Sequence, residues 1–326
     1  MWVTSSLATV LTPTAIALGN FDGVHQGHRQ VISPVLAIPH AGAGRAHATV
    51  VTFHPHPQEF FTGQPRELLS PLTEKIAHLK HLGVEQLVLL PFDRELASLS
   101  PEQFVQNILC DKLQAVCVCV GSDFRFGQKR AGTAYDLQTA AIARGVATTI
   151  APLKLLSGER ISSSAIRAAL QQGDLKTANR LLGRSYTLLG EVVTGQQLGR
   201  TIGFPTANLK VPPDKFLPQT GVYAVQVQCQ PENFSLNAPK FPAVMNLGYR
   251  PTVDGTQQVI EVHLLDWSGN LYGQTIVVHL EHFLRPEQKF DSLDALKTQI
   301  QTDCATARVL LASSEGQEQN ANSDAV

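Results

Sequence analysis

Charged residues are scarce in this chain, and neither sign of charge is in excess. Of its 326 residues, 16% are charged, and Lys plus Arg (26) nearly equal Asp plus Glu (27). The resulting net charge of −1 provides no overall field that would draw the chain to nucleic acid or to an anionic membrane. Both partners are therefore excluded as expectations, and any anion that the protein binds must be held by a local site.

Cysteine and long apolar runs are also lacking. The chain has five cysteines, and no His or Cys stands at zinc-finger spacing around Cys117 and Cys119. We expect core thiols in a reducing compartment. No stretch reaches the roughly 18 apolar residues of a membrane span, and the first residues lack a basic segment and are interrupted by Pro13. The sequence favours a cytoplasmic protein whose first residues form an irregular lead-in.

From Thr14 to about Gly183, short apolar runs alternate with longer helical patterns. The strand candidates are TAIALG, ATVVTF, QLVLLPF, AVCVCVG and VATTIAP, and segments such as LTEKIAHLKHLG between them have helical periodicity. Continuous apolar strands joined by helices predict a Rossmann-like α/β domain, with a parallel sheet covered on both faces. The chain length predicts a second domain.

The second half has a different order of secondary-structure patterns. Strand patterns follow one another without helices in GEVVTG, GVYAVQVQCQ, AVMNLG, QQVIEVHLLDW and QTIVVHLEHFL, which predicts a small antiparallel β-barrel. The alternation in VYAVQVQ predicts that Gln226 and Gln228 lie on a solvent-exposed face of the strand. A helix, SLDALKTQIQTDCATARVLLA, closes the domain. The predicted domains are 1–183 and 184–311, followed by a disordered polar tail, 312–326.

The segment GNFDGVHQGHR, residues 19–29, joins the first strand to a helix expected to start near Val24. Its glycines allow a ligand to approach the backbone, and a helix N-terminus attracts anions. His25 and His28 lie three residues apart and therefore share one helical face. They are suited to hydrogen-bond phosphate oxygens and to stabilise charge during attack on an α-phosphate. An incidental pair or a partial metal site is the alternative.

A second segment, RISSSAIRAAL, follows the fifth strand candidate and begins another helix. Its hydroxyls can cap the helix or donate to phosphate, and its two arginines could clamp the β- and γ-phosphates. Simple N-capping beside a surface arginine is the alternative. The residues concerned are Ser162, Ser163, Ser164, Arg160 and Arg167.

In the second half, GQQLGRTIGFPTANL contains a glycine-rich loop and a Pro-Thr-x-Asn turn. Repeated glycines suit a loop whose backbone amides close over phosphates. Thr206 and Asn208 offer neutral oxygen ligands for a Mg²⁺ that also binds phosphate oxygens. A glycine-rich hairpin is the structural alternative. The loop residues concerned are Gly195, Gly199, Arg200 and Gly203.

Glu261 lies in the middle of the apolar strand VIEVHLLDW. Such a carboxylate destabilises a strand unless it is solvated, paired or used in catalysis. One interpretation is an edge-strand charge that discourages aggregation. The other is a general base that takes the proton from a hydroxyl attacking a γ-phosphate.

These motifs together resemble one family. GNFDGVHQGHR, TFHPHP, GSDFRFGQKRAG and ISSSAIR are similar to the adenylyltransferase module of the bacterial bifunctional riboflavin kinase/FAD synthetases. GFPTAN, GVYAV, NLGYRPT and EVHLLD resemble its riboflavin kinase module, a compact β-barrel. The resemblance extends from about Thr14 to Leu311.

The resemblance implies a role for each matching residue. In the kinase module, Thr206 and Asn208 would hold Mg–ATP and Glu261 would activate the ribityl 5′-hydroxyl. In the adenylyltransferase module, the implied contacts to ATP phosphates come from His25, His28, Ser163 and Arg167, with Arg160 close by. Phe53, His56 and Asp123 would line the place where FMN and the nucleotide meet. Some family members have asparagine at the position that Asp123 occupies in this chain. The expected binding set also includes Gly19, Phe21, Ser162, Ser164, Gly199, Arg200 and Gly203.

The expected function is therefore bifunctional. The C-terminal domain would phosphorylate riboflavin with ATP to give FMN, and the N-terminal domain would transfer AMP from a second ATP to FMN, giving FAD and pyrophosphate. Mg²⁺ is expected for both steps, and a homo-oligomer is left open. The alternatives are an enzyme that keeps one of the two activities, and a flavin-binding regulator or carrier without turnover.

Overall fold

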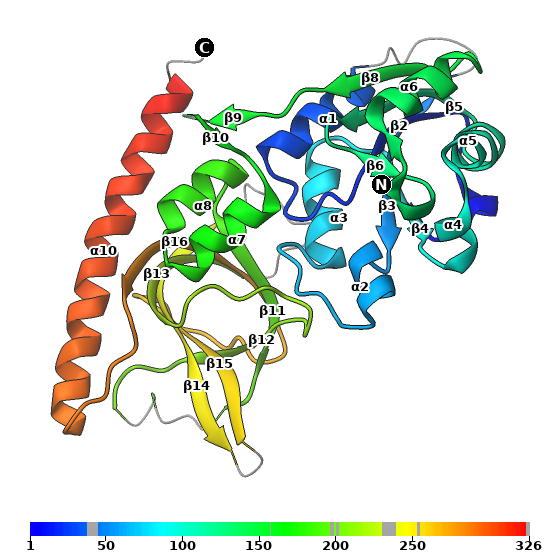
Figure 1. Ribbon diagram of the computed structural model, residues 1–326. Helices are drawn as coiled ribbons and strands as arrows, with labels where there is room; N and C mark the ends of the chain where they lie inside the picture. The colour runs from blue at the N-terminus through cyan, green and yellow to red at the C-terminus, as the bar shows by residue number, and fades with distance from the viewer. Residues whose placement is uncertain are drawn as a thin grey trace. The chain divides into compact units, whose positions relative to one another are not determined.

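The computed structural model describes residues 1–37, 45–156, 158–195, 199, 202–229, 239–252 and 255–323, and side chains are not described at 250–257 and 314–323. Arg200, one of the predicted binding residues, lies outside this description. The chain forms two compact units, Met1–Ser163 and Ser164–Val326 (Figure 1). Of the helices in the described ranges, none is both long and apolar enough to cross a membrane.

A six-stranded parallel sheet forms the centre of the first unit. Five strands correspond to the predicted ones, which confirms the parallel α/β domain. The sixth, β1, is a short edge strand within the predicted irregular lead-in, where three residues are too few to give a periodic signal. In sheet order the strands are β1 (Trp2–Thr4), β4 (Gln86–Pro91), β3 (His47–His54), β2 (Thr14–Leu18), β5 (Ala115–Gly121) and β8 (Ala147–Ala151).

Apolar side chains pack on both faces of this sheet. Ile32 and Val35 of α1 and Leu79 of α3 pack on one face. Val105 and Leu109 of a π-helix, η2, pack on the other, together with α6. The helices are α1 (Gln26–Leu36), α2 (Pro57–Thr62), α3 (Leu72–His81), α4 (Arg94–Ser98), α5 (Pro101–Gln103), η2 (Phe104–Lys112) and α6 (Ala134–Ile142), with 3₁₀ turns η1 (Leu7–Thr9) and η3 (Gln128–Arg130).

The strand order places the predicted motifs at one edge of the sheet. From β2 the chain continues to β3 and β4 on one side, and then to β5 and β8 on the other. Ligands of such sheets bind at the carboxyl ends of the strands where the order reverses. The segments after β2, β3, β5 and β8 all carry predicted site residues. Two small hairpins complete the unit: β6 (Arg125–Phe126) with β7 (Gly132–Thr133), and β9 (Leu155–Leu156) with β10 (Glu159–Arg160).

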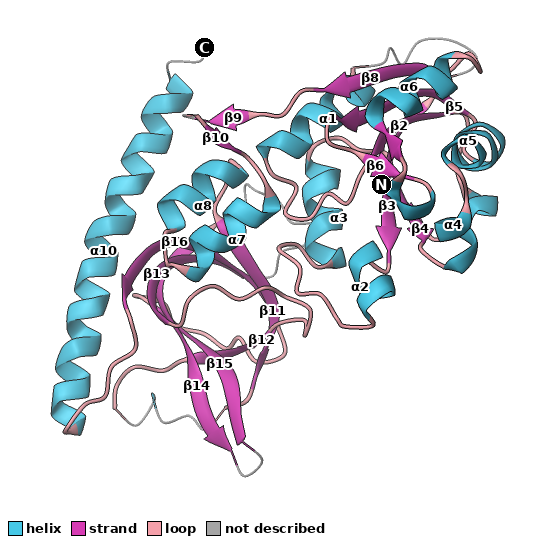
Figure 2. Ribbon diagram, in the orientation of Figure 1, coloured by secondary structure: helices cyan, strands magenta, loops and turns pink. Residues whose placement is uncertain are grey.

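The second unit contains a closed antiparallel barrel, as predicted. Its strands, in order around the barrel, are β11 (Tyr186–Val193), β12 (Ala207–Lys210), β15 (Gly255–Leu264), β14 (Lys240–Thr252), β13 (Gly221–Cys229) and β16 (Thr275–Arg285). Helix α10 (Leu293–Ser323) lies along the barrel (Figure 2), where Ala307 and Leu311 pack against Val222 and Val244. The buried side chains on the opposite face of these strands fill the barrel interior, among them Tyr223, Met245 and Val262.

Helices α7 (Ser163–Gln171) and α8 (Leu175–Leu182) cluster with the barrel, so the compact units divide 20 residues before the predicted boundary at 183. The physical reason is direct bonding: the Asn179 amide donates to the carbonyl of Leu280 at 2.8 Å and accepts the Tyr186 N–H at 2.8 Å. At the other end, α10 continues to Ser323. The functional boundary at 183 and the disordered tail after 311 stay predictions.

One face of β13 differs from its expectation. Gln228, predicted to be wetted, is 2% exposed, and its Oε1 lies 3.1 Å from Nε2 of His279. Burial lowers the pKa of His279 to about 3. The sequence predicted the alternation of side chains along β13. It did not predict that His279 of β16 would be a buried hydrogen-bond partner for Gln228. The five cysteines are free thiols, and burial raises the pKa of Cys119 to about 11, as expected for a core thiol.

Candidate active sites

The turn after β2 has an unusual backbone. Phe21, Gly23 and Val24 have φ angles of 49°, 87° and 41°. Left-handed backbone at non-glycine residues, above all at β-branched Val24, costs about 1–3 kcal/mol per residue unless the surroundings hold it. Phe21 and Val24 are both 1% exposed and belong to the core on one face of the sheet, so their packing holds the turn in this conformation.

This turn brings the two predicted histidines together. His25 is the N-cap of α1, and its Nδ1 accepts the backbone N–H of His28 at 3.2 Å. The two rings stack with centroids 3.5 Å apart and planes 13° apart. Because Nδ1 accepts a hydrogen bond, the neutral His25 ring carries its proton on Nε2. The helix starts at Gln26 and not at Val24, because this capping bond defines its first turn.

Gly27 allows the His25 ring to adopt this position. A Cβ at residue 27 would lie 3.2 Å from both Cε1 and Nδ1 of His25. As for the metal alternative, the described residues contain no group of three or more His, Cys, Asp or Glu side chains that could hold an ion.

The serine-rich segment lies beside this turn. The Ser163 hydroxyl donates to the backbone carbonyl of Asp22 at 2.8 Å, and the Asp22 carboxylate accepts the Ser70 N–H at 3.2 Å. Ser162 is half-buried next to it. Ser164 and Arg167 belong to the second unit, where the Arg167 guanidinium lies over the ring of Phe216, 5.5 Å from its centroid.

The segment after β3 presents His56 and Phe53. His56 is the N-cap of α2. Its ring Nδ1 accepts the Gln58 backbone N–H at 3.1 Å, and its backbone N–H donates to the Glu59 carboxylate at 2.9 Å. Burial, and secondly the charge of Arg66, lower the pKa of His56 to about 4. The ring is therefore neutral at pH 7 and presents an Nε2–H donor.

An aromatic group next to His56 was not predicted. Phe53 packs edge-on against Phe92 at 5.6 Å, and Phe60 and Phe61 of α2 pack against the same ring. Phe61 is 68% exposed. The paired phenylalanines directly after the His-Pro segment were the available signal, because an exposed aromatic on a short helix is costly without a partner.

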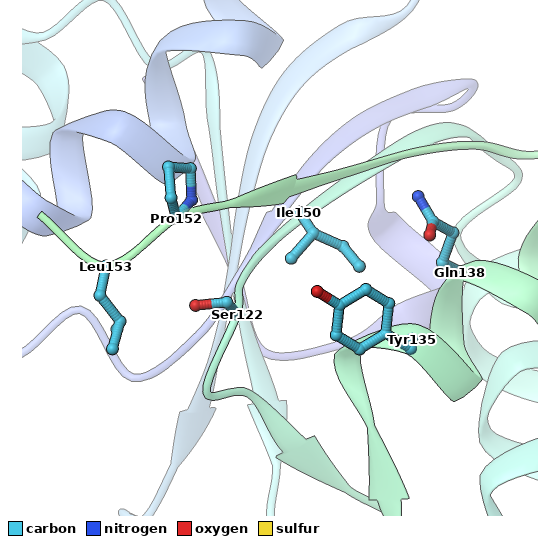
Figure 3. A pocket seen from close by; sticks show the side chains of 6 residues that line it. All are labelled: Ser122, Tyr135, Gln138, Ile150, Pro152 and Leu153. Carbon is cyan, nitrogen blue, oxygen red and sulfur yellow. The ribbon is translucent and has the colours of Figure 1, made fainter.

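Asp123 and Arg160, predicted separately, form an ion pair in which both side chains are about half exposed. Asp123 follows β5 and Arg160 ends β10, so the pair lies at the same edge of the sheet as the histidines. A cavity of about 530 Å³ opens at the carboxyl ends of β5 and β8 (Figure 3). Its lining residues are Ser122, Tyr135, Gln138, Ile150, Pro152 and Leu153.

In the barrel, strand register assembles the second site. Asn208 of β12 is directly opposite Glu261 of β15, and Glu261 is directly opposite Asn246 of β14. Opposed residues of antiparallel strands point to the same side, with Cβ atoms about 4.5–5.5 Å apart. Ile260 and Val262 face the barrel interior, so Glu261 is on the outer face and half-buried. Asn246 was not predicted, although its place in AVMNLG, between apolar residues, was a signal.

The glycine loop lies against the Thr-x-Asn turn. A Cβ on Gly195 would lie 2.2 Å from Nδ2 of Asn208, and a Cβ on Gly199 would lie 3.2 Å from Oγ1 of Thr206. His263 holds the turn, because its Nδ1 lies 2.8 Å from the carbonyl oxygen of Pro205. Gly203 has a φ of 92°, which favours glycine.

The second site offers the oxygen ligands that Mg²⁺ prefers, from the hydroxyl of Thr206, the amide of Asn208 and the carboxylate of Glu261. A Cβ on either glycine would collide with the turn, so the loop backbone lies directly against Thr206 and Asn208. The donor set thus fits Mg–ATP.

Comparison with known proteins identifies both halves of the chain. Residues 8–165 match the family model of FAD synthetase, and residues 182–311 match that of riboflavin kinase. The bifunctional riboflavin kinase/FMN adenylyltransferase of Haemophilus influenzae is 39% identical over 307 residues, covering 92% of this chain and 94% of that protein. The enzyme of the same name from Escherichia coli K12 is 41% identical over 295 residues, covering 90% and 91%.

A solved structure from Streptococcus pneumoniae, described as a macrolide-efflux protein, covers 94% of this chain and 98% of its own, with a TM-score of 0.81 and 30% identity. That description differs from the names of the curated relatives, whereas the two family models and the curated relatives agree with one another. The chain therefore belongs to the bifunctional riboflavin kinase/FMN adenylyltransferase family.

Proposed function

We propose a division of the two flavin-converting reactions between the two sites. In the barrel, the γ-phosphate of ATP passes to riboflavin and gives FMN. In the α/β unit, AMP passes from a second ATP to FMN and gives FAD and pyrophosphate. Both reactions are in-line displacements at phosphorus, in which positioning and neutralisation of charge supply most of the catalysis.

In the kinase reaction, Glu261 is the general base. Its carboxylate accepts the proton of the ribityl 5′-hydroxyl as that oxygen attacks the γ-phosphorus. Asn208, next to Glu261, and Thr206 hold the triphosphate, and the backbone of Gly195 and Gly199 covers it. Mg²⁺, when bound there, neutralises charge on the phosphate oxygens. The observation that carries this assignment is the shared register of Asn208, Glu261 and Asn246 on one face of the barrel.

In the adenylyltransferase reaction, an oxygen of the FMN phosphate attacks the α-phosphorus of ATP, and pyrophosphate leaves. His25, neutral and protonated at Nε2, donates to a phosphate oxygen. His28, whose ring stacks on His25, is the second imidazole that contacts the phosphates. The positive end of the α1 helix dipole adds a favourable field for the same phosphates. No covalent intermediate is needed.

Arg160 changes partner in this reaction. In the free protein its guanidinium is paired with Asp123. A triphosphate carries more charge than one carboxylate, so we infer that ATP draws Arg160 onto the leaving phosphates, beside Ser163. Asp123 is then available to the rest of the nucleotide. We assign the nucleobase to the cavity lined by Tyr135 and Ile150, which offers apolar side chains beside the polar groups of Ser122 and Gln138.

The flavin is assigned to the side of β3, where Phe53 and the exposed ring of Phe61 offer stacking surfaces and His56 offers a neutral donor. Binding of ATP, riboflavin, FMN and FAD follows from the two reactions. Both steps are proposed to require Mg²⁺.

Glu261→Gln tests the two-site assignment. We expect kinase activity to fall by about 10²–10⁴-fold, because the amide cannot accept the proton, while adenylylation of supplied FMN stays within twofold of wild type. The matched control is Glu281→Gln, a glutamate of barrel strand β16 that accepts a hydrogen bond from Ser185, and it should leave both activities unchanged. Products of ATP with riboflavin, and separately with FMN, are measured by chromatography. A parallel loss of both activities in folded protein would contradict the assignment.

A further inference from the structure

A lysine that the proposed mechanism does not use is buried beneath the turn after β2. Lys75 of α3 is 8% exposed, and its Nζ donates to the carbonyl oxygen of Asn20 at 3.0 Å. Lysine is almost never buried without a partner. Burial lowers the pKa of its ammonium group, and the carboxylate of Asp22, itself 3% exposed, acts in the opposite direction. The contact that geometry gives the buried ammonium is therefore its hydrogen bond to the backbone of the turn.

The turn needs such support, because its left-handed residues follow directly after Asn20. Phe21, Gly23 and Val24 all have positive φ, and the conformation persists only where the surroundings over-determine it. The Thr52 hydroxyl also donates to the Asn20 carbonyl, at 3.1 Å. On the far side of the turn, Ser70 and Ser163 hold Asp22.

The position of both catalytic imidazoles depends on this turn. His25 follows Val24 directly and caps α1, and His28 stacks on it while its ring packs edge-on against Phe21 at 5.3 Å. A shift of the Asn20–Val24 backbone would therefore move His25, and with it the ring that stacks on it. A misplacement of about 1 Å is enough to cost about 10²-fold in rate.

We propose that Lys75 is a positioning residue for FMN adenylylation: its buried ammonium fixes the Asn20 carbonyl and so holds the turn that aims His25 and His28 at the phosphates. The proposal rests on the proposed role of the two histidines. It assigns Lys75 an effect chiefly on the reaction rate, because the turn positions the two rings that stabilise charge in the transition state.

The test is Lys75→Met, which keeps the length and apolar stem of the side chain and removes the ammonium. The control is Lys80→Met on the same helix, where the lysine is exposed. We expect kcat for FMN adenylylation to fall by about 10–10²-fold with KM for ATP within about threefold of wild type. Riboflavin kinase activity of the same molecules, which arises in the other unit, should stay unchanged, and Lys80→Met should match wild type in both reactions.

A second readout does not depend on activity. Nitrogen NMR of the imidazoles reports which ring nitrogen of His25 is protonated. In wild type we expect the Nε2–H tautomer, and in Lys75→Met a mixture of tautomers as the capping bond to His28 is lost. If wild type itself does not adenylylate FMN, the proposed function fails, whereas the NMR comparison still tests Lys75.

Several results would overturn the proposal: an unchanged kcat in Lys75→Met, a rise in KM alone, or a parallel loss of kinase activity. Should Lys75→Met fail to fold, Thr52→Val decides. It removes the other donor to the same carbonyl with a nearly isosteric side chain, and the proposal requires a smaller fall in kcat with KM retained. Wild-type kcat in folded Thr52→Val would then refute it.

Discussion

Two glycines illustrate how single residues build the sites. Gly27 and Gly195 have ordinary backbone angles, so conformational freedom does not explain them. Each instead makes room for a functional side chain of the same unit: the His25 ring lies against Gly27, and the Asn208 amide lies against Gly195. The sequence suggested close approach of a ligand to these glycines. The structure shows that side chains of the protein itself, His25 and Asn208, lie against these glycines.

Gly195→Ala tests this at the residue scale. The added Cβ would lie 2.2 Å from the Asn208 amide, so Asn208 or the loop must move. We expect kinase kcat/KM to fall by at least about 10²-fold, since a shift of about 1 Å in a positioning group has that effect. Adenylylation of supplied FMN by the same preparation is the internal control. Kinase activity equal to wild type would show that the contact between Gly195 and Asn208 has no functional role.

At the scale of elements, the N-terminus of α1 combines a structural and a chemical task in one side chain. His25 caps the helix through Nδ1, and in the proposed reaction its Nε2 donates to the substrate. Histidine is an uncommon cap, and asparagine is among the best. Capping and chemistry can therefore be separated by substitution.

His25→Asn and His25→Ala form a matched pair. Asparagine keeps an acceptor for the helix, so its free energy of unfolding should stay within about 0.5 kcal/mol of wild type, whereas alanine should lose about 1 kcal/mol. Both variants should lose FMN adenylylation by about 10²–10³-fold, because both lack the Nε2–H donor. Chemical denaturation and the FMN assay check the two statements. An active His25→Asn would show that the ring serves only as a cap.

The register of β12, β15 and β14 shows where element-level prediction reached its limit. Alternation in VIEVHLLDW was enough to predict that Glu261 faces one side of the strand and that Ile260 and Val262 face the other. It did not identify β12 as a strand, because four residues give too little periodicity, and so it could not pair Asn208 with Glu261 or find Asn246. Strand pairing is a non-local property that no single segment encodes.

At the scale of the whole molecule, each unit has its own core and its own site. Each core is closed by its own elements, the sheet with helices on both faces in one unit and the barrel with α10 in the other. Each chemical step should therefore proceed in a molecule whose other site is inactive.

Mixing two variants tests this independence. Glu261→Gln alone and His25→Asn alone should each fail to convert riboflavin to FAD. An equimolar mixture should recover FAD formation after a lag, because FMN released by the His25→Asn molecules is adenylylated by the Glu261→Gln molecules. Chromatography of flavins over time follows the lag and the recovery. Lack of FAD in the mixture, with FMN present, would mean that FMN is used only by the molecule that makes it.

The sequence by itself determined the α/β unit and the barrel and supplied most of the candidate site residues, because apolar periodicity, glycine placement and the motif residues are local properties. Tertiary structure alone decided which side chains meet: the stacking of His25 on His28, the pairing of Asp123 with Arg160, the row of Asn208, Glu261 and Asn246, and the burial of Lys75 under a strained turn. These contacts join segments distant in the chain. Their energies come from burial and hydrogen bonding that exist only once the sheet and the barrel have closed.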